Sequence, residues 1–237
     1  MSKAKQFWNK EYGKAKRSGG SNPHLALSTE PAEDLVKFAK WLERREGRKS
    51  LNVTAQALDL GCGNGRNLLF LSREYGVRGV GYDISETAIA QAQKAAQGLP
   101  LRFEVRSLSE PIPLPDSSVT LALDMMSSHV LLEAERRQLR DEIFRVLRPG
   151  GWLFFRSFLL EEDLHAKRLL KESPGPEEGM YIHPEIGAPE YVWAEDSFTD
   201  FYGERFAIEK IDKSFKHRHE DGSAWKRRTL AAYLQKS

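Results

Sequence analysis

The stretch Ala57-Leu58-Asp59-Leu60-Gly61-Cys62-Gly63-Asn64-Gly65-Arg66-Asn67 decides the fold class of this chain. A short apolar run ends in an acidic residue, glycines follow at alternate positions, and Asn67 opens a segment with helical spacing. Glycine has no Cβ and tolerates positive φ, so a strand that turns through these glycines can bring its backbone close to a ligand. The helix that follows offers free N–H groups at its N-terminus. The pattern therefore predicts a strand, a ligand-binding turn and a helix.

The order of the glycines distinguishes two kinds of nucleotide-binding turn. The dinucleotide fingerprint has glycine at its first, third and sixth positions, and Arg66 stands at the sixth position here, which argues against a nicotinamide-dependent oxidoreductase. The order Asp59-x-Gly61-x-Gly63-x-Gly65 instead resembles motif I of the class I S-adenosylmethionine-dependent methyltransferases. The resemblance implies S-adenosylmethionine as cofactor. It places these residues around it: Asp59, Gly61, Cys62, Gly63 and Asn67.

A second acidic residue follows the next apolar run. Asp83 ends the segment Val77-Arg78-Gly79-Val80-Gly81-Tyr82-Asp83 and lies 18 residues beyond Gly65. This spacing is close to that at which an acid at the end of a second strand meets a ribose, whose hydroxyls donate to the carboxylate. The resemblance makes Asp83 the ribose ligand and sets Ile84 and Ser85 beside the adenine. The alternative is that Asp83 only caps the helix that starts near Ser85.

Patterns typical of strands and helices alternate through the middle of the chain. Strands are expected at 55–60, 78–83, 101–105, 119–124 and 152–157, and helices at 65–75, 86–97 and 133–147. Strands separated by helices pair in parallel through right-handed crossovers. Two strand-like runs at 205–214 and 225–234 have no helix between them and are expected to form an antiparallel hairpin at the sheet edge. The fold class is therefore α/β, and the resemblance implies a seven-stranded, mostly parallel, doubly wound sheet with an antiparallel C-terminal hairpin.

The 237 residues are enough for one α/β domain with a sizeable core. We expect four parts: an N-terminal helical cap at 1–50, a cofactor-binding core at 51–157, an insertion at 158–195, and a C-terminal helix and hairpin at 196–237. A connection as long as the insertion is usually either functional or disordered. Because it carries aromatic residues such as Tyr181 and Trp193, we interpret it as an ordered lid over a substrate. A variable surface loop is the alternative.

The opening segment also has a counterpart in the family. Phe7-Trp8-Asn9-Lys10-Glu11-Tyr12-Gly13 resembles the start of many small-molecule methyltransferases, in which a leading helix folds over the cofactor. Trp8 and Tyr12 share one helical face. A helix that docks only for stability is the alternative.

The sequence departs from the family after its third and fourth strands. Many relatives carry an acidic residue after the third strand for the adenine amino group, whereas Arg106-Ser107-Leu108 stands here. The adenine contact is therefore expected from the Ser107 hydroxyl or the Leu108 backbone. After the fourth strand, the Asn/Asp-Pro-Pro-aromatic signature of nucleic-acid amino methylation and the Pro-Cys nucleophile of cytosine methylation are both absent. These absences argue against base-modifying enzymes.

The end of the fourth strand supplies the catalytic candidate. His129 follows this strand at the carboxyl edge, where α/β sheets bind ligands, and it is the best candidate for a general base or acceptor-orienting group. A capping or packing histidine is the alternative. Asp124 and Met125 are expected to line the methionine end of the cofactor, although Met125 can equally serve in packing.

Composition narrows the class of protein further. The formal net charge of +2 does not demand a polyanionic partner, and the single cysteine rules out an intrachain disulfide and a cysteine-rich metal site, so no metal is expected. The N-terminus lacks the apolar run of a signal peptide, and no stretch approaches the length of a membrane span, so the expected location is the cytoplasm. Oligomeric state is left open.

A methyltransferase acting on a small molecule is the favoured function. A protein side chain or RNA is the alternative acceptor, since basic residues flank the tip of the expected C-terminal hairpin: Lys213, Lys216, His217, Arg218, His219, Lys226, Arg227 and Arg228. Because the sequence has no recognised nucleic-acid-binding module, a solvated hairpin is the favoured explanation of these charges. A non-catalytic cofactor-binding subunit is the third hypothesis.

Overall fold

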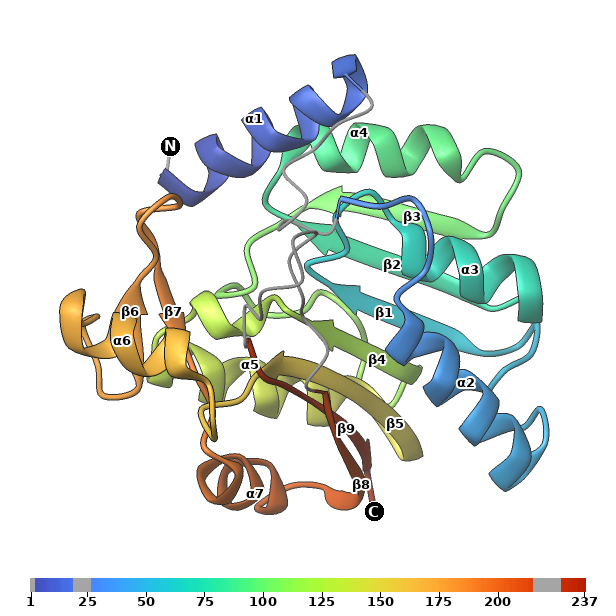
Figure 1. Ribbon diagram of the computed structural model, residues 1–237. Coiled ribbons are helices and arrows are strands. Elements are labelled where there is room, and N and C mark those ends of the chain that lie inside the picture. Colours follow the sequence, from blue (N-terminus) through green and yellow to red (C-terminus); the bar gives the residue numbers. More distant parts are fainter. Residues whose placement is uncertain (1–2, 19–26, 215–226) are drawn as a thin grey trace.

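A seven-stranded sheet with helices on both faces forms the protein (Figure 1). The structure, a computed structural model, describes residues 3–18, 27–214 and 227–237. The strand order is β3-β2-β1-β4-β5-β9-β8. The strands are β1 (Gln56–Leu60), β2 (Arg78–Asp83), β3 (Leu101–Val105), β4 (Val119–Met125), β5 (Leu147–Phe158), β8 (Ala207–Ser214) and β9 (Thr229–Gln235).

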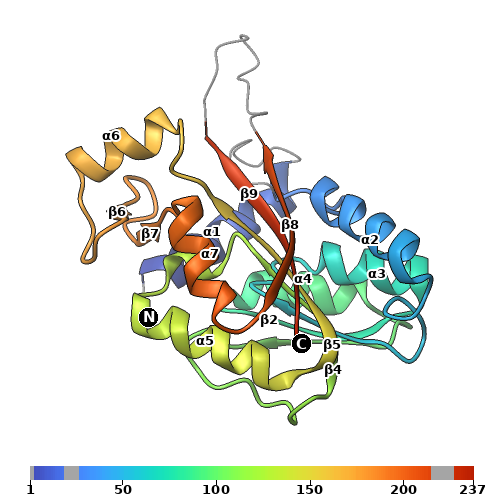
Figure 2. The same ribbon diagram turned by 90° about the horizontal axis from the view of Figure 1, so that it is seen from below.

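Two layers of helices cover the sheet. The helices are α1 (Lys3–Ser18), α2 (Glu33–Glu46), α3 (Arg66–Tyr75), α4 (Glu86–Ala95), α5 (Glu133–Val146), α6 (Leu164–Glu172) and α7 (Glu195–Gly203). Helices α2, α3 and α4 bury their apolar faces in one core cluster, which contains Phe38, Leu68 and Ile89. Helices α5 and α7 pack on the other face, in a cluster with Ile143 and Phe198 (Figure 2). Helix α1 lies outside these layers, beside α4.

The register of the parallel strands brings their carboxyl ends to one edge. Leu60 at the end of β1 pairs with Tyr82 of β2 and with Asp124 of β4. Strands β3 and β5 extend the parallel part of the sheet, and β9 pairs antiparallel with both β5 and β8. The loops after β1, β2 and β4 therefore meet above this edge, where open α/β sheets bind ligands.

These observations confirm the predicted fold class and correct two details. The fifth strand was expected at 152–157, but β5 already begins at Leu147 and so includes Pro149, Gly150 and Gly151. The pairing with β4 jumps from Val119–Leu147 to Leu121–Trp152, so the glycines form an irregularity within the strand. The C-terminal strands pair as expected, but only β8 lies at the edge, because β9 runs between β5 and β8.

The segment expected to be an insertion has secondary structure of its own. It contains α6 and a small antiparallel pair, β6 (Met180–Ile182) and β7 (Pro189–Tyr191). Trp193 anchors its end: this side chain is buried and its ring packs against Phe155, Phe198 and Tyr202. The segment is therefore fastened to the core under α7 at its C-terminal end.

A search of the described residues for a helix long and apolar enough to cross a membrane found none.

Phe155→Ala tests the aromatic core that holds α7 and the insertion. Phe155 is fully buried and its ring contacts Trp193, Phe198 and Tyr202. Removing it should lower the free energy of unfolding by about 3–5 kcal/mol, because the cavity collapses only in part. Urea denaturation measures the change. Val53→Ala is the matched control, because Val53 is 68% exposed and its truncation should change stability by less than about 0.5 kcal/mol. Similar losses in both variants would contradict this account.

Candidate functional site

The glycine-rich turn after β1 has positive φ values, and two side chains of the chain itself lie close to its backbone. Gly61 and Gly63 have φ values of 73° and 54°, in the left-handed region that favours glycine. A Cβ on Gly61 would lie 2.3 Å from the Ser127 Cβ, and a Cβ on Gly63 would lie 2.2 Å from the Tyr12 hydroxyl oxygen. Side chains are therefore excluded at both positions by conformation and by space.

Asp83 at the end of β2 braces this turn. Its Oδ2 accepts a hydrogen bond of 2.9 Å from the Gly63 N–H, and its Oδ1 accepts one of 2.8 Å from the Ser85 N–H. Burial raises the pKa of Asp83, and these backbone bonds oppose the rise. Ser85, rather than Asp83, caps α4, because its hydroxyl accepts the Ala88 N–H. The capping alternative for Asp83 is therefore wrong, and the carboxylate stays at the mouth of the turn.

Two further carboxylates are buried beside the turn. Asp59 of β1 and Asp124 of β4 are each at most 1% exposed, and the Oδ2 atom of each lacks a hydrogen-bond partner among the described residues. The other oxygen of Asp124 accepts bonds from the Ser127 hydroxyl and the Ser128 N–H. Burial, and then the neighbouring Asp83, raise the pKa of Asp59 to about 7. Unpartnered buried carboxylate oxygens favour a cationic ligand.

Asn67 links the turn to the end of β4. Its Nδ2 donates to the Met125 sulfur at 3.5 Å, and its Oδ1 accepts the Ala32 N–H at the start of α2. The next residue, Met126, has a φ of 58°, which is uncommon for a side chain of this size. Such backbone strain clusters at functional sites. The predicted residues Asn67 and Met125 are thus in contact with each other.

The remaining predicted cofactor residues also lie at this edge. Ile84 is half-buried after β2. Ser107 follows β3, where its hydroxyl contacts that of Ser109 at 2.8 Å, and Leu108 packs against the core. Cys62 is buried within the turn, and burial raises the pKa of its thiol, so this thiol is a packing group rather than a nucleophile.

Helix α1 contacts the turn and the start of α4. Asn9 Oδ1 accepts the Ser85 hydroxyl at 2.8 Å, and the Tyr12 carbonyl accepts the Gln91 amide at 2.9 Å. The Tyr12 hydroxyl rests on Gly63. Burial and the nearby Asp83 raise the pKa of Tyr12, so its phenol stays protonated. The side chains of Ser85 and Tyr12 therefore hold α1 over the place where a nucleoside would bind.

His129 lies in a short 3-10 turn (Ser128–Val130) just after β4, and it is 6% exposed. Its Nε2 faces Glu190 Oε1 of β7 at 3.7 Å, and its Nδ1 is buried without a partner among the described residues. Its ring meets the Phe158 ring edge-on, with 5.3 Å between centroids.

Sequence reasoning missed Glu190 as a partner of His129. The two residues are far apart in the chain, and no motif marks Glu190.

The basic residues of the C-terminal hairpin do not gather on one open face where they are described. Arg227 donates to Asp163 and to the Tyr181 hydroxyl, and Arg228 pairs with Glu162. Lys213 pairs with Glu195. Lys216, His217, Arg218, His219 and Lys226 lie outside the described residues.

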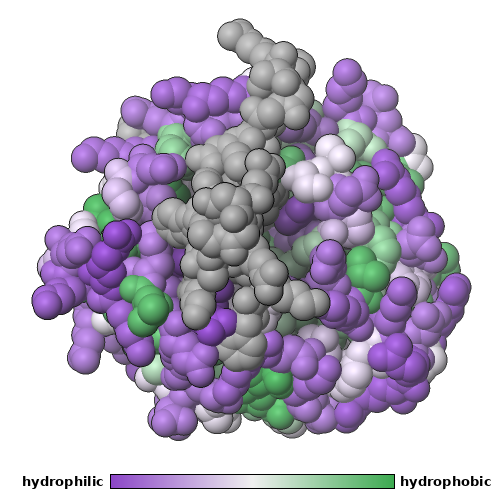
Figure 3. All heavy atoms as spheres, in the orientation of Figure 1, coloured by the Kyte–Doolittle hydropathy of each residue, from purple (hydrophilic) through white to green (hydrophobic). Residues whose placement is uncertain are grey.

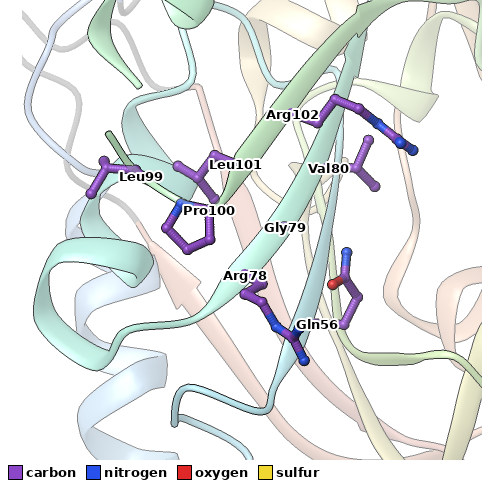
Figure 4. A pocket seen from close by; sticks show the side chains of 8 residues that line it. All are labelled: Gln56, Arg78, Gly79, Val80, Leu99, Pro100, Leu101 and Arg102. Carbon is purple, nitrogen blue, oxygen red and sulfur yellow. The ribbon is translucent and has the colours of Figure 1, made fainter. Parts of the chain in front are cut away.

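The described surface on the side of Figure 1 is mostly hydrophilic, with small separated hydrophobic areas (Figure 3). A groove of about 310 Å³ lies at the opposite edge of the sheet, at the amino ends of β1, β2 and β3. Figure 4 shows Leu99 and Pro100 on one side of β2 there and Gln56 on the other. Because it lies at the amino ends of the strands, this groove is separate from the site around Asp59 and Asp83.

Comparison with known proteins agrees with this geometry. Residues 57–151 match the model of a family described as "Methyltransferase domain". A solved S-adenosylmethionine-dependent methyltransferase from Methanosarcina mazei superposes with a TM-score of 0.66 at 28% identity, covering 80% of this chain and 95% of that one. The fold, the glycine turn, the family model over residues 57–151 and this solved structure all support a class I S-adenosylmethionine-dependent methyltransferase.

Two curated relatives align with part of the chain. One is the glycine/sarcosine/dimethylglycine N-methyltransferase of Actinopolyspora halophila, 28% identical over 58% of this chain and 25% of its own length. The other is the 27-O-demethylrifamycin SV methyltransferase of Amycolatopsis mediterranei, 31% identical over 60% of this chain and 53% of its own length. The similarity thus spans between a quarter and about half of these relatives.

The residues present fit the cofactor of this class. The unpartnered oxygens of Asp59 and Asp124 suit the positive charges of a sulfonium and an ammonium group, and Asp83 is placed to accept ribose hydroxyls.

Asp59→Asn tests the raised pKa of Asp59. A carboxyl whose pKa is higher in the folded than in the unfolded chain makes the free energy of unfolding fall as the pH rises from about 4 to about 7. Without its charge, the variant should exceed the wild type in stability at pH 8 by up to about 4 kcal/mol. The difference should shrink towards pH 4. Thermal denaturation across this range measures it in the ligand-free protein.

Asp200→Asn is the matched control for this experiment, because Asp200 is exposed on α7. It should leave the pH profile unchanged. If Asp59→Asn shows the same dependence of stability on pH as the wild type, the raised pKa of Asp59 is contradicted.

Proposed function

We propose that this protein transfers a methyl group from S-adenosylmethionine to a nucleophilic atom of a small molecule. One observation carries the cofactor part of the proposal. The Asp59, Asp83 and Asp124 carboxylates meet at one sheet edge beside a turn that excludes side chains, and two of them have a buried oxygen without a partner. A cation with ribose hydroxyls matches this arrangement.

Methyl transfer from a sulfonium requires mainly that the protein hold the acceptor and the methyl group in the correct relative position. When bound, S-adenosylmethionine supplies an activated methyl group, whose bond to sulfur breaks as the acceptor atom takes it. Asp59 and Asp124 hold the positive end of the ligand, and Asp83 holds its ribose. Holding an acceptor in line can account for roughly 7–11 kcal/mol of the barrier.

His129 is the residue proposed to act on the acceptor. Its Nδ1 has no partner among the described residues, so the lone pair is free to take the proton of an acceptor hydroxyl or amine that reaches it. Charge balances, because the proton leaves the acceptor as the methyl group arrives. An acceptor with a lone pair already free would need His129 only for orientation.

Two features support a small acceptor. Helix α1 and the insertion (158–195) both cover the ligand-binding edge, and they come close together, since a Cβ on Gly187 would lie 3.8 Å from the Lys3 side chain. Covers of this kind exclude water and suit a substrate that can be enclosed. The two relatives from Actinopolyspora halophila and Amycolatopsis mediterranei are also methyltransferases of small molecules.

Calorimetric titration of S-adenosylmethionine into the wild type and Asp83→Ala tests the cofactor site. The variant should bind about 10- to 150-fold more weakly, because hydrogen bonds to a charged acceptor contribute about 1.5–3 kcal/mol. Glu74→Gln, which removes an exposed carboxylate from α3, should bind like the wild type. Equal binding by the Asp83 variant would contradict the ribose role, and no binding by the folded wild type would refute the methyltransferase proposal.

Transfer of labelled methyl from S-adenosylmethionine into cell extract tests the acceptor. Label in the fraction of small molecules supports the proposal. Label confined to protein or to RNA would overturn the small-molecule assignment and favour a macromolecular acceptor. His129→Gln should lower the rate by about 10²- to 10⁴-fold if the acceptor must lose its proton early.

A further inference from the structure

Five side chains from separate parts of the chain form a closed cycle of contacts, which we name the His129 network: His129, Glu190, Tyr181, Arg227 and Phe158. Glu190 faces His129 Nε2 and accepts the Tyr181 hydroxyl on its other oxygen at 2.5 Å. Arg227 donates to the Tyr181 oxygen at 2.9 Å and lies 3.6 Å above the Phe158 ring. The Phe158 ring packs edge-on against the His129 ring, which closes the cycle. The network thus joins the turn after β4 to β5, β6, β7 and the residues just before β9.

Glu190 is held in place from both sides. It is 4% exposed and lies directly opposite Tyr181 in the small β6–β7 sheet. Arg227, which orients Tyr181, is itself fixed by Asp163, whose Oδ2 accepts its Nε at 3.2 Å. A carboxylate with both oxygens occupied and its neighbours fixed cannot swing away from His129 without breaking other contacts.

Glu190 is also ionised over the working range of pH. Burial would raise the pKa of Glu190, but contacts with His129 and Tyr181 lower it to about 2. The charged groups around His129 are Glu190 from β7 and Asp124 from β4, whose charge interacts with the imidazole. Arg227, just before β9, contacts Tyr181 and Phe158, which in turn lie beside Glu190 and His129. Glu190 is the acid that faces the Nε2 atom among the residues that the structure describes.

A carboxylate beside one imidazole nitrogen favours the proton on that nitrogen, and this leaves the lone pair on the other. We propose that Glu190 is a positioning residue of the insertion: it holds the His129 proton on Nε2, so that Nδ1 is the basic atom available to the acceptor. The proposal rests on the role proposed above for His129. It makes the insertion part of the reacting site as well as a cover over it.

A purely structural pair is the competing explanation. In that case Glu190 holds the insertion against β4, and its replacement lowers stability without changing where the neutral imidazole carries its proton. The two explanations differ in a spectroscopic signature of the ligand-free protein, so neither an acceptor nor turnover is needed to separate them.

The experiment is long-range ¹H–¹⁵N NMR of the full chain labelled on its histidines. Spectra are recorded over a series of rising pH values, and the tautomer ratio is taken where the ¹⁵N shifts no longer change with pH. His129→Gln identifies the signal of His129 by its loss. We expect the Nε2–H tautomer to dominate in the wild type and the ratio of Nε2–H to Nδ1–H to fall at least fivefold in Glu190→Gln. Tyr181→Phe should lower it less, because the carboxylate remains but loses one donor.

Glu185→Gln is the matched control, since it removes an exposed carboxylate from the same insertion, between β6 and β7. It should leave the ratio within twofold of the wild type. A wild type without Nε2–H preference, or a ratio that Glu190→Gln leaves unchanged, would overturn the proposal. If Glu190→Gln does not fold, the proposal is still tested by the tautomer ratio of the wild type and by its change in Tyr181→Phe. Cofactor binding by the wild type, titrated separately, distinguishes failure of this inference from failure of the proposed function.

Discussion

The cost of burying carboxylates at one edge of the sheet governs the arrangement of this protein. Parallel pairing of β1 with β2 and β4 places Asp59, Asp83 and Asp124 around a single turn. A buried charge is costly unless it is paired or hydrogen-bonded. Asp83 is bonded to backbone N–H groups, Asp124 is bonded in part, and Asp59 retains a proton more readily than usual. One oxygen of Asp59 and one of Asp124 still have no partner among the described residues, which is why we propose that a cation binds there.

The site has two covers with different chemistry. Helix α1 contacts the glycine turn through Tyr12 and the start of α4 through Asn9. The insertion contacts the other side, where Glu190 faces His129. If the proposed function holds, α1 lies on the cofactor side and the insertion on the acceptor side, and each is held by its own polar contacts.

Much of the fold was predictable, because the patterns that specify it are local. Apolar runs end at Asp59 and at Asp83, and glycine or a capping serine follows each of them. Such a local pattern predicts a strand and the turn after it. The strand boundaries were least accurate around Leu147, where Pro149 and the glycines after it indicated a turn but lie within β5. There the pairing with β4 overrides the local turn signal.

The sequence by itself determined the class of protein and the cofactor edge, because the glycine turn and the acids after β1 and β2 act through short-range geometry. It also indicated His129 as a residue at that edge. Only the tertiary structure decided what His129 meets. Glu190 and Arg227 come from distant segments, and their contacts depend on how the insertion packs under α7 and beside β9. Such contacts join residues that are far apart in the sequence and form only when the chain folds, so no local sequence pattern predicts them.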